Sequence, residues 1–529
     1  MIVLDSQDPQ DAKSTLAPVA GNTVRRPDRV FGGSTPSLVL PDYETSQAIE
    51  LEALHLLRSP SSSSNSIHRY KRASVRQWIP SRFWRIMFYV MILYVVLTLA
   101  IGVPLLVLKV FKRSSPKAVQ ISPLALSWVD DEPHDSPLYL ENGVLVRSEN
   151  STCDRWSLVD VPVSGNLSLT AAKYNLPATG SISMRLTTLY SNSLPELTAG
   201  GSLNVAFNSN PKQTQALFNV SLHTSSPSVR ENAHVCFQQA GADRGVVIYI
   251  PTNLTIGDTL SLDIQLLLPR PSAGLKVTKL ATYLPGIEQI FWRMDSYRFT
   301  QMNIEGAQAS IGFKSLMAQN MVVKNSLSPI IGTFNITRSL HLDNVGGTVN
   351  TNISMVHDSS NDSPTFVSID SGNGDIRAKL LLSSPLKRSV LSNPQPNFTA
   401  YVKTFDAPIN IDIDYDSSTP VAPLNMAVQN NLGASNITVD ARYEGTFDAQ
   451  TKLSQATVIE EQVDSWYDPA GLHRDFRYEY DHKSSNRIFG WVGWGARLRT
   501  TGQSNIVASS SMSPVSIRFR ERTITRTRR

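Results

Sequence analysis

The chain has 529 residues, 18% of them charged, and a formal net charge of +5 at pH 7. The length is too great for one compact core and indicates several folding units. The basic excess lies largely beside one hydrophobic segment and near the C-terminus, without a recognition helix or zinc-finger pattern, so nucleic-acid binding is not indicated. The abundance of Ser, Thr and Asn instead indicates an exposed β protein with many polar turns.

Residues 1–85 mix Pro, Ser, Asp and Arg without a repeating apolar pattern, which predicts a disordered arm. Glu52 stands four positions before the pair Leu56-Leu57, the spacing of a dileucine sorting signal. A short amphipathic helix over Tyr43–Leu57 explains the same residues. The basic run His68–Arg76 is expected to attract anionic lipids of a cytosolic leaflet.

The segment Ile86–Leu108 contains 23 consecutive residues without a charge. At about 1.5 Å per residue, a helix of this length spans a hydrocarbon core of about 30 Å. A buried soluble helix is the alternative, but such helices seldom run this long without a polar face. The segment begins far from Met1 and is longer than a signal-peptide core, so we interpret it as a signal anchor.

The residues around this segment indicate its orientation. Lys and Arg are more numerous before it than after it, which favours a cytosolic N-terminus. Asn-x-Ser/Thr glycosylation sequons occur only after it, at Asn150, Asn166, Asn219, Asn253, Asn335, Asn352, Asn361, Asn397 and Asn436. We therefore expect a single-pass type II glycoprotein of the plasma membrane or the secretory and endosomal pathway. Residues 109–129 would form a stalk, and the C-terminal domain would be extracellular or lumenal.

The two cysteines, Cys153 and Cys236, also follow the segment. An oxidising compartment would allow them to form a disulfide, and two cysteines have one possible connectivity. Two unrelated buried thiols are the alternative.

Residues 130–285 contain short runs in which apolar and polar residues alternate, separated by Asn, Ser, Gly and Pro. Examples are Gly201–Phe207, Phe218–His223, Gly245–Ile250 and Thr259–Leu268. This pattern predicts strands and turns, and hence a β-sandwich-like unit.

Residues 286–519 contain a fourteen-residue repeat. Its six copies start at Met321, Leu340, Val367, Ala400, Met426 and Ile506. Apolar residues occupy the first and third positions, a small polar residue the fifth, and apolar residues return at the tenth (except at Ser435) and the fourteenth. The fourteenth-position residues are Phe334, Ile353, Leu380, Ile413, Val439 and Phe519.

Each copy predicts a strand, a bend and a second strand, with alternate side chains on one side. Stacked copies would bury these apolar rows together, which predicts a short β-solenoid or roll, followed by a basic tail at 520–529. A meandering sandwich is the competing architecture. The fifth-position residue, such as Ser371, is expected to be exposed at the bend and to have few contacts.

These repeats resemble the adhesin-like β-solenoid family, as do Tyr443–Phe447 and Gly490–Gly495 before the last copy. The whole chain resembles fungal single-pass membrane proteins that carry such a domain outside one anchor. The resemblance spans Leu140 to Phe519 and implies a mainly β surface domain with an adhesive role and no agreed activity. The chain departs from the pattern at Ser435 and in its bends, which lack Asn-Gly except at Asn373-Gly374.

The sequence contains no nucleophile elbow, phosphate loop, dinucleotide fingerprint or zinc-spaced ligand set. Two polar clusters offer groups with known chemistry. Asp412, Asp414 and Asp416 alternate along one strand and could bind Ca²⁺, although a solvated strand face is the simpler interpretation. The second cluster offers acid–base groups, although a polar insertion is the simpler interpretation here too: His473, Asp475, Glu479, Asp481 and His482. We therefore assign no catalytic, cofactor or metal residues.

Two hypotheses about function remain. The first is a non-catalytic, adhesin-like surface protein that binds cell-wall polysaccharide or other surface partners, with the lipid bilayer as its anchor. The alternative is a membrane-anchored, carbohydrate-active enzyme on a β-helix scaffold. A pair of carboxylates at about 5 to 10 Å on one face would favour the enzyme.

Overall fold

In the computed structural model, all described residues lie within one compact unit, Lys117–Arg529. They are residues 138–141, 144–147, 151–154, 156–158, 168–188, 199–225, 227–240, 243–251, 258–270, 277–357, 363–384, 397–417, 419, 422–497 and 504–521. The predicted arm, membrane segment, stalk and most of the basic tail lie outside this set, as do the sequons at Asn150, Asn166, Asn253 and Asn361. Among the described helices, none has the length and apolar character to cross a bilayer.

The described chain is mainly β, as the alternating pattern predicts. The elements before the repeats are β1 (Leu138–Glu141), β2 (Val144–Arg147), β3 (Ser151–Cys153), β4 (Trp156–Leu158), β5 (Ser168–Pro177), β6 (Gly180–Thr188), β7 (Ala199–Phe207), β8 (Gln215–Thr224), α3 (Pro227–Glu231), β9 (His234–Ala240), β10 (Asp243–Ile250), β11 (Leu260–Leu268), β12 (Val277–Tyr283) and β13 (Glu288–Phe291). The elements that follow are β14 (Met294–Glu305), β15 (Ile311–Asn325), β16 (Ile330–Asn344), β17 (Val349–Val356), β18 (Thr365–Ser371), β19 (Ile376–Ser383), β20 (Phe398–Thr404), β21 (Ile409–Tyr415), β22 (Leu424–Asn430), β23 (Ser435–Asp440), β24 (Gly445–Thr451), β25 (Ala456–Glu460), η1 (Ser465–Tyr467), β26 (Phe476–Lys483), β27 (Arg487–Trp494), β28 (Ser504–Ser510) and β29 (Val515–Arg520).

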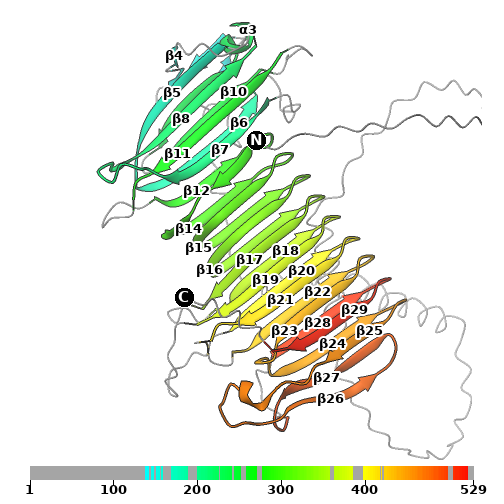
Figure 1. Cartoon of the computed structure of the whole chain (residues 1–529). Helices are drawn as coiled ribbons and strands as arrows, with labels where there is room; N and C mark the ends of the chain where they lie inside the picture. The colour runs from blue at the N-terminus through cyan, green and yellow to red at the C-terminus, as the bar shows by residue number, and fades with distance from the viewer. Residues whose placement is uncertain are drawn as a thin grey trace, which may run out of the picture. The chain divides into compact units, whose positions relative to one another are not determined.

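Except for the β1–β2 hairpin, the strands belong to one large mixed sheet whose pairings follow two series. We call the first series layer I; its order is β3, β9, β10, β6, β12, β14, the second halves of β15 and β16, β18, β20, β22, β28, β24, β27 and β26. We call the second series layer II; its order is β4, β5, β8, β11, β7, β13, the first halves of β15 and β16, β17, β19, β21, β23, β29 and β25. The long strands β15 and β16 therefore join the two layers, and Figure 1 shows the strands that follow lying side by side.

The two layers share one core. Alternate side chains of each strand are buried, and a single cluster of buried apolar residues extends from Ala172 to Phe519. Across the layers, the rings of Phe447 in β24 and Phe519 in β29 have centroids 5.7 Å apart. The expected domain boundary at 285/286 lies between β12 and β13, and both strands pair with strands on either side of it.

The repeat sets the pairing register. In layer I, Leu340 pairs with Val367 and Val367 pairs with Ala400, so the first positions align. In layer II, Ile353, Leu380 and Ile413 align in the same way at the fourteenth position. The expected register is thus observed. Ser435 also takes its tenth-position place, fully buried, with its hydroxyl lacking a hydrogen-bond partner among the described residues.

The order of the copies in space differs from their order in the chain. The last copy, β28 and β29, lies between β22/β23 on one side and β24/β25 on the other (Figure 1). The pair β24/β25 is a further copy that the sequence comparison missed, with Phe447, Ala449 and Thr451 at its first, third and fifth positions. Antiparallel β27 and β26 then continue layer I beyond β24.

The bends differ from the expectation. Ser371 is only 2% exposed, and its hydroxyl accepts a hydrogen bond of 3.0 Å from the backbone N–H of Gly374. The side-chain oxygens of Asn344 and Asn430 accept the equivalent bond at their bends. The expectation of exposed bend residues with few contacts was therefore wrong, because these side chains turn inward to satisfy the bend backbone. Gly374 is required there, since a Cβ atom would lie 1.9 Å from the carbonyl oxygen of Gly347.

Candidate functional site

Asp412 and Asp414 lie on β21 and form ion pairs within the chain, whereas Asp416 follows the end of that strand. Asp414 is largely buried and lies 3.2 Å from the ammonium group of Lys379. Asp412 lies 3.4 Å from the guanidinium of Arg520. No group of three or more His, Cys, Asp or Glu suited to a metal occurs among the residues that the structure describes. Asp412 is thus a half-exposed, charge-paired carboxylate, whereas Asp414 departs from the expected solvated strand face because it is buried beside Lys379.

The acidic and histidine residues between His473 and His482 do not converge on one point. Asp475 pairs with Arg477, and Asp481 pairs with Arg497. The imidazole of His482 contacts the hydroxyl of Ser484 at 3.3 Å. Because these groups have separate partners, the structure assembles no acid–base pair from them.

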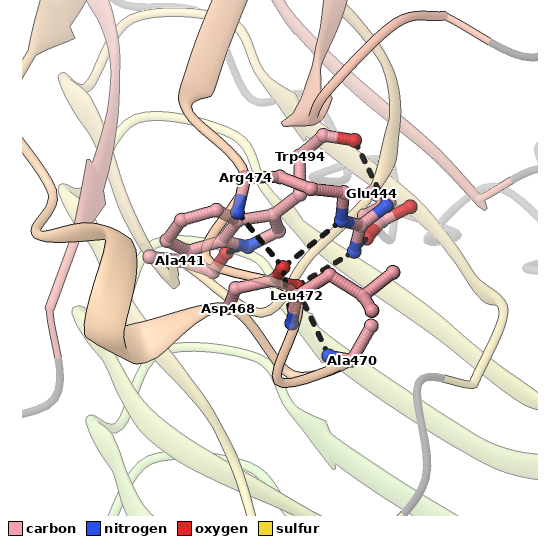
Figure 2. A network of polar contacts seen from close by, with 7 residues as sticks. All are labelled: Ala441, Glu444, Asp468, Ala470, Leu472, Arg474 and Trp494. Atoms are coloured by element: carbon pink, nitrogen blue, oxygen red, sulfur yellow. Dashed lines mark hydrogen bonds and ion pairs between the residues drawn. The ribbon is translucent and has the colours of Figure 1, made fainter.

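A different network forms beside them, centred on Asp468 and Arg474 (Figure 2). The carboxylate of Asp468 has no exposed side-chain surface and accepts hydrogen bonds from the backbone N–H groups of Ala470, Leu472 and Arg474. The guanidinium of Arg474 donates to both oxygens of Asp468, to the carbonyl of Trp494 and to Glu444. The sequence pattern does not indicate this pairing, since Asp468 lies outside the cluster between His473 and His482.

Electrostatics follow from these contacts. Hydrogen bonds from Arg474 hold the pKa of the Asp468 carboxyl well below its ordinary value. Burial raises the pKa of Glu444, an effect that Arg474 opposes. The network is therefore a charged clamp that fixes the loop between η1 and β26 against the start of β24 and the end of β27.

The outer side of this loop is apolar and exposed. We call residues 464–474, which comprise η1 and the loop that follows it, the clamp loop. Its side chains Trp466, Tyr467 and Leu472 have exposed fractions of 76%, 39% and 69%. The imidazole of His473 packs edge-on against the indole of Trp466, with ring centroids 4.4 Å apart. Large apolar side chains gathered on a fixed loop are typical of a recognition surface.

A second exposed feature lies on the outer face of layer I. The rings of His341, Phe366 and Tyr401 lie on the neighbouring strands β16, β18 and β20, with successive centroids 5.1 and 5.6 Å apart. Tyr401 is 45% exposed. We call these three residues the aromatic row. Aligning the copies could have revealed it, because His341 and Tyr401 share the second position of the repeat.

A row of charges runs beside the aromatic row on the same face. It consists of Glu305, Lys324, Asp343, Asp370 and Lys403, which are register partners on successive strands. Burial, reinforced by Asp370, raises the pKa of Asp343. Burial and the nearby Lys324 lower the pKa of His341. Aromatic and charged groups thus meet on one flat strand surface.

The predicted modification residues have distinct environments. Cys153 and Cys236 are opposite each other on β3 and β9 and form a disulfide. The sequon residues Asn352 and Asn436 are exposed on β17 and β23 of layer II. Asn219, Asn335 and Asn397 are half-buried.

The fold and these surfaces define a mainly β protein with one large mixed sheet. No family model matches the chain, and no curated protein matches its sequence. Among solved structures, the chain is similar to the crystal structure of a "putative cell adhesion protein" from Clostridium sporogenes. The identity is 7% and the TM-score 0.17, and the match covers 67% of this chain and 100% of the other. With values this low, the likeness does not extend to activity or partners.

Proposed function

We propose that the chain is a non-catalytic, adhesin-like surface protein that binds cell-wall glycans or other surface partners through the outer face of layer I. The aromatic row is the observation that carries this proposal. The three rings lie side by side on neighbouring parallel strands, tilted by 43° and 50° to one another, with Tyr401 exposed and the other two half-buried. The charged row beside them supplies hydrogen-bonding groups. We interpret the stacked copies as a short β-solenoid or roll, an architecture that suits an extended binding surface.

The anchor is part of the same proposal. The uncharged run Ile86–Leu108 and the sequons that follow it support a type II membrane protein with its β domain outside the cytosol. The Cys153–Cys236 disulfide is typical of an oxidising compartment. Protease treatment of sealed microsomes should remove a small N-terminal fragment and leave the β domain intact. Loss of the β domain with a protected arm would reverse the orientation.

Replacing Tyr401 with Ala tests the binding surface. Purified full-length protein should lose at least tenfold in affinity for immobilised cell-wall polysaccharides and for positive spots on a glycan array. Ile331 is the matched control, because it is 48% exposed on the outer face of layer II. Equal binding by the Tyr401 and Ile331 variants would reject the layer I face.

A glycan added to the same face gives an independent test. Ala427→Thr creates an Asn-x-Thr sequon at Asn425, which is exposed on β22, next to β20. Protein made in a secretory host should then carry a glycan beside Tyr401 and lose binding. Ala427→Val introduces a side chain of nearly the same shape, creates no sequon and should leave binding unchanged.

A carbohydrate-active enzyme is the second candidate function, favoured by Asp343 and Asp370. Asp343 and Asp370 are register partners on adjacent strands. The backbones of neighbouring strands are about 4.8 Å apart. Glycosidases that retain configuration place two carboxyl groups about 5 Å apart, one of them protonated. The raised pKa of Asp343 fits the protonated role. Release of new reducing ends from polysaccharide, abolished by both Asp343→Asn and Asp370→Asn, would establish this function; binding without release would exclude it.

A further inference from the structure

We propose that the clamp loop is a second carbohydrate-binding site, separate from the aromatic row, in which the indole of Trp466 stacks on a neutral sugar ring. The clamp loop shares no residue with the layer I face, so this site goes beyond the function proposed above. Three properties of the loop support it: the exposure of its aromatic side chains, the rigidity of its backbone, and the charge of the groups around it.

The apolar side chains of the loop are unusually exposed. Trp466 is the most exposed large apolar side chain among the described residues, at 76%. Leu472 and Tyr467 stand beside it on the same short loop. A solitary exposed apolar residue needs no explanation, but three on one short loop are typical of a binding surface.

The loop is held rigidly although its outer side chains are free of the core. Asp468 accepts three backbone N–H groups of the loop, and Arg474 ties that carboxylate to Trp494 and Glu444 (Figure 2). At the N-terminal end, the side chain of Asp464 accepts the backbone N–H of Trp466. His473 adopts a φ of 54°, an unusual conformation for a residue with a Cβ atom. Fixing the loop in advance removes an ordering cost from ligand binding.

The indole is oriented as well as exposed. His473 contacts Trp466 at an interplanar angle of 76°, and this contact fixes the orientation of an indole that remains 76% exposed. A pyranose ring has one face of C–H groups and a rim of hydroxyls. The C–H face suits the indole, and the hydroxyls suit carboxylate acceptors such as Asp464 and Asp475, whose side chain is 75% exposed.

The surrounding charge selects a neutral ligand. Arg474 is paired with Asp468 and Glu444, and Asp464 and Glu521 add two further carboxylates beside the loop, with Glu521 accepting a hydrogen bond from the backbone N–H of Asp464. Asp475 is neutralised by Arg477. A net negative surface repels anionic lipids and sulfated or carboxylated glycans. A bilayer-binding loop, in contrast, typically has Lys and Arg around its apolar residues.

The experiment compares Trp466→Ala with Leu453→Ala in the full-length protein. Leu453 lies at the bend between β24 and β25 and is 75% exposed, so the two substitutions remove equally exposed apolar groups. The probes are soluble β-glucan, mannan and chito-oligosaccharides, with phosphatidylserine vesicles as a separate arm, and binding is measured by calorimetry. Trp466→Ala should weaken binding of at least one neutral sugar tenfold or more, with Leu453→Ala unchanged.

Two further variants make the result decisive. Arg474→Met loosens the loop without removing a proposed contact, and should weaken the same sugar by a smaller factor. Tyr401→Ala separates the two surfaces: if it abolishes all sugar binding and Trp466→Ala has no effect, the clamp loop is refuted and the layer I face survives. If instead Trp466→Ala abolishes sugar binding and Tyr401→Ala has no effect, the clamp loop is supported as the binding site and the layer I face is rejected. Trp466-dependent binding to the vesicles, or no sugar binding by the unaltered protein, also overturns the proposal.

Discussion

Replacing Leu380 with Ala tests the stacking of the copies most directly. Leu380 has no exposed surface and aligns with Ile353 on one side and Ile413 on the other. The change removes three carbon groups from the core, which at about 0.8 kcal/mol each amounts to about 2.4 kcal/mol of transfer free energy. The neighbouring strands are fixed by backbone hydrogen bonds and cannot close the cavity, so the total cost should lie toward the upper part of the range of about 2 to 5 kcal/mol.

The next residue provides the control. Leu381 has the same chemistry on the same strand, but it points to the outer face and is half-buried. Leu381→Ala should cost about 1 kcal/mol or less. Urea unfolding of the purified full-length protein measures both free energies, provided that the m-values agree between variants. Equal and small effects would show that the fourteenth positions do not stack in one core.

Other substitutions test the bends, the disulfide and the clamp. Ser371→Ala should cost about 1 to 2 kcal/mol, because it leaves the buried N–H of Gly374 without its acceptor, while Ser368→Ala on the outer face should be nearly neutral in the same urea-unfolding experiment. Cys153→Ser should lower stability by roughly 2 to 5 kcal/mol, since the disulfide closes a loop between residues 83 apart; two free thiols in denatured, unreduced protein would contradict the bond. Because the folded pKa of Asp468 is depressed, its contribution to stability is present above its unfolded pKa of about 3.9 and is lost as the pH falls toward the folded value. Between pH 7 and pH 2, the free energy of unfolding should therefore fall less steeply with decreasing pH in Asp468→Asn than in the unaltered protein. An unchanged pH dependence would show that the charge of Asp468 does not contribute to stability.

The register of the copies could be predicted from the sequence because strand side chains alternate strictly. Once Ile353 and Leu380 were aligned, their strands could pair in one way that kept both inside. Which copies lie next to each other could not be predicted, since every copy has the same row of buried apolar side chains and would pair equally well with any other. β28 therefore pairs with β22 and β24 without any signal in its own residues.

Other features were missed for local reasons. The copy at β24/β25 was overlooked because the exposed Glu460 occupies its fourteenth position. Ser371 was misjudged because a polar side chain at a bend suggests solvent, whereas here the bend backbone needs it. The Asp468–Arg474 clamp depends on where the loop between η1 and β26 meets β24 and β27, which the sequence does not reveal.

The placement of β28 and β29 between earlier strand pairs has a consequence for biosynthesis. As the chain emerges from the ribosome, β24 and β25 become available before the strands that will join them to β22 and β23. Until β28 is synthesised, the backbone groups along one edge of β22 and one edge of β24 have no strand partner. During that interval these edges can pair with another chain. A stop codon before Ser504 would remove an internal layer of the stack and leave β22/β23 and β24/β25 without the strands that pair with both. Folding of this part of the stack therefore cannot finish before β29 has been synthesised.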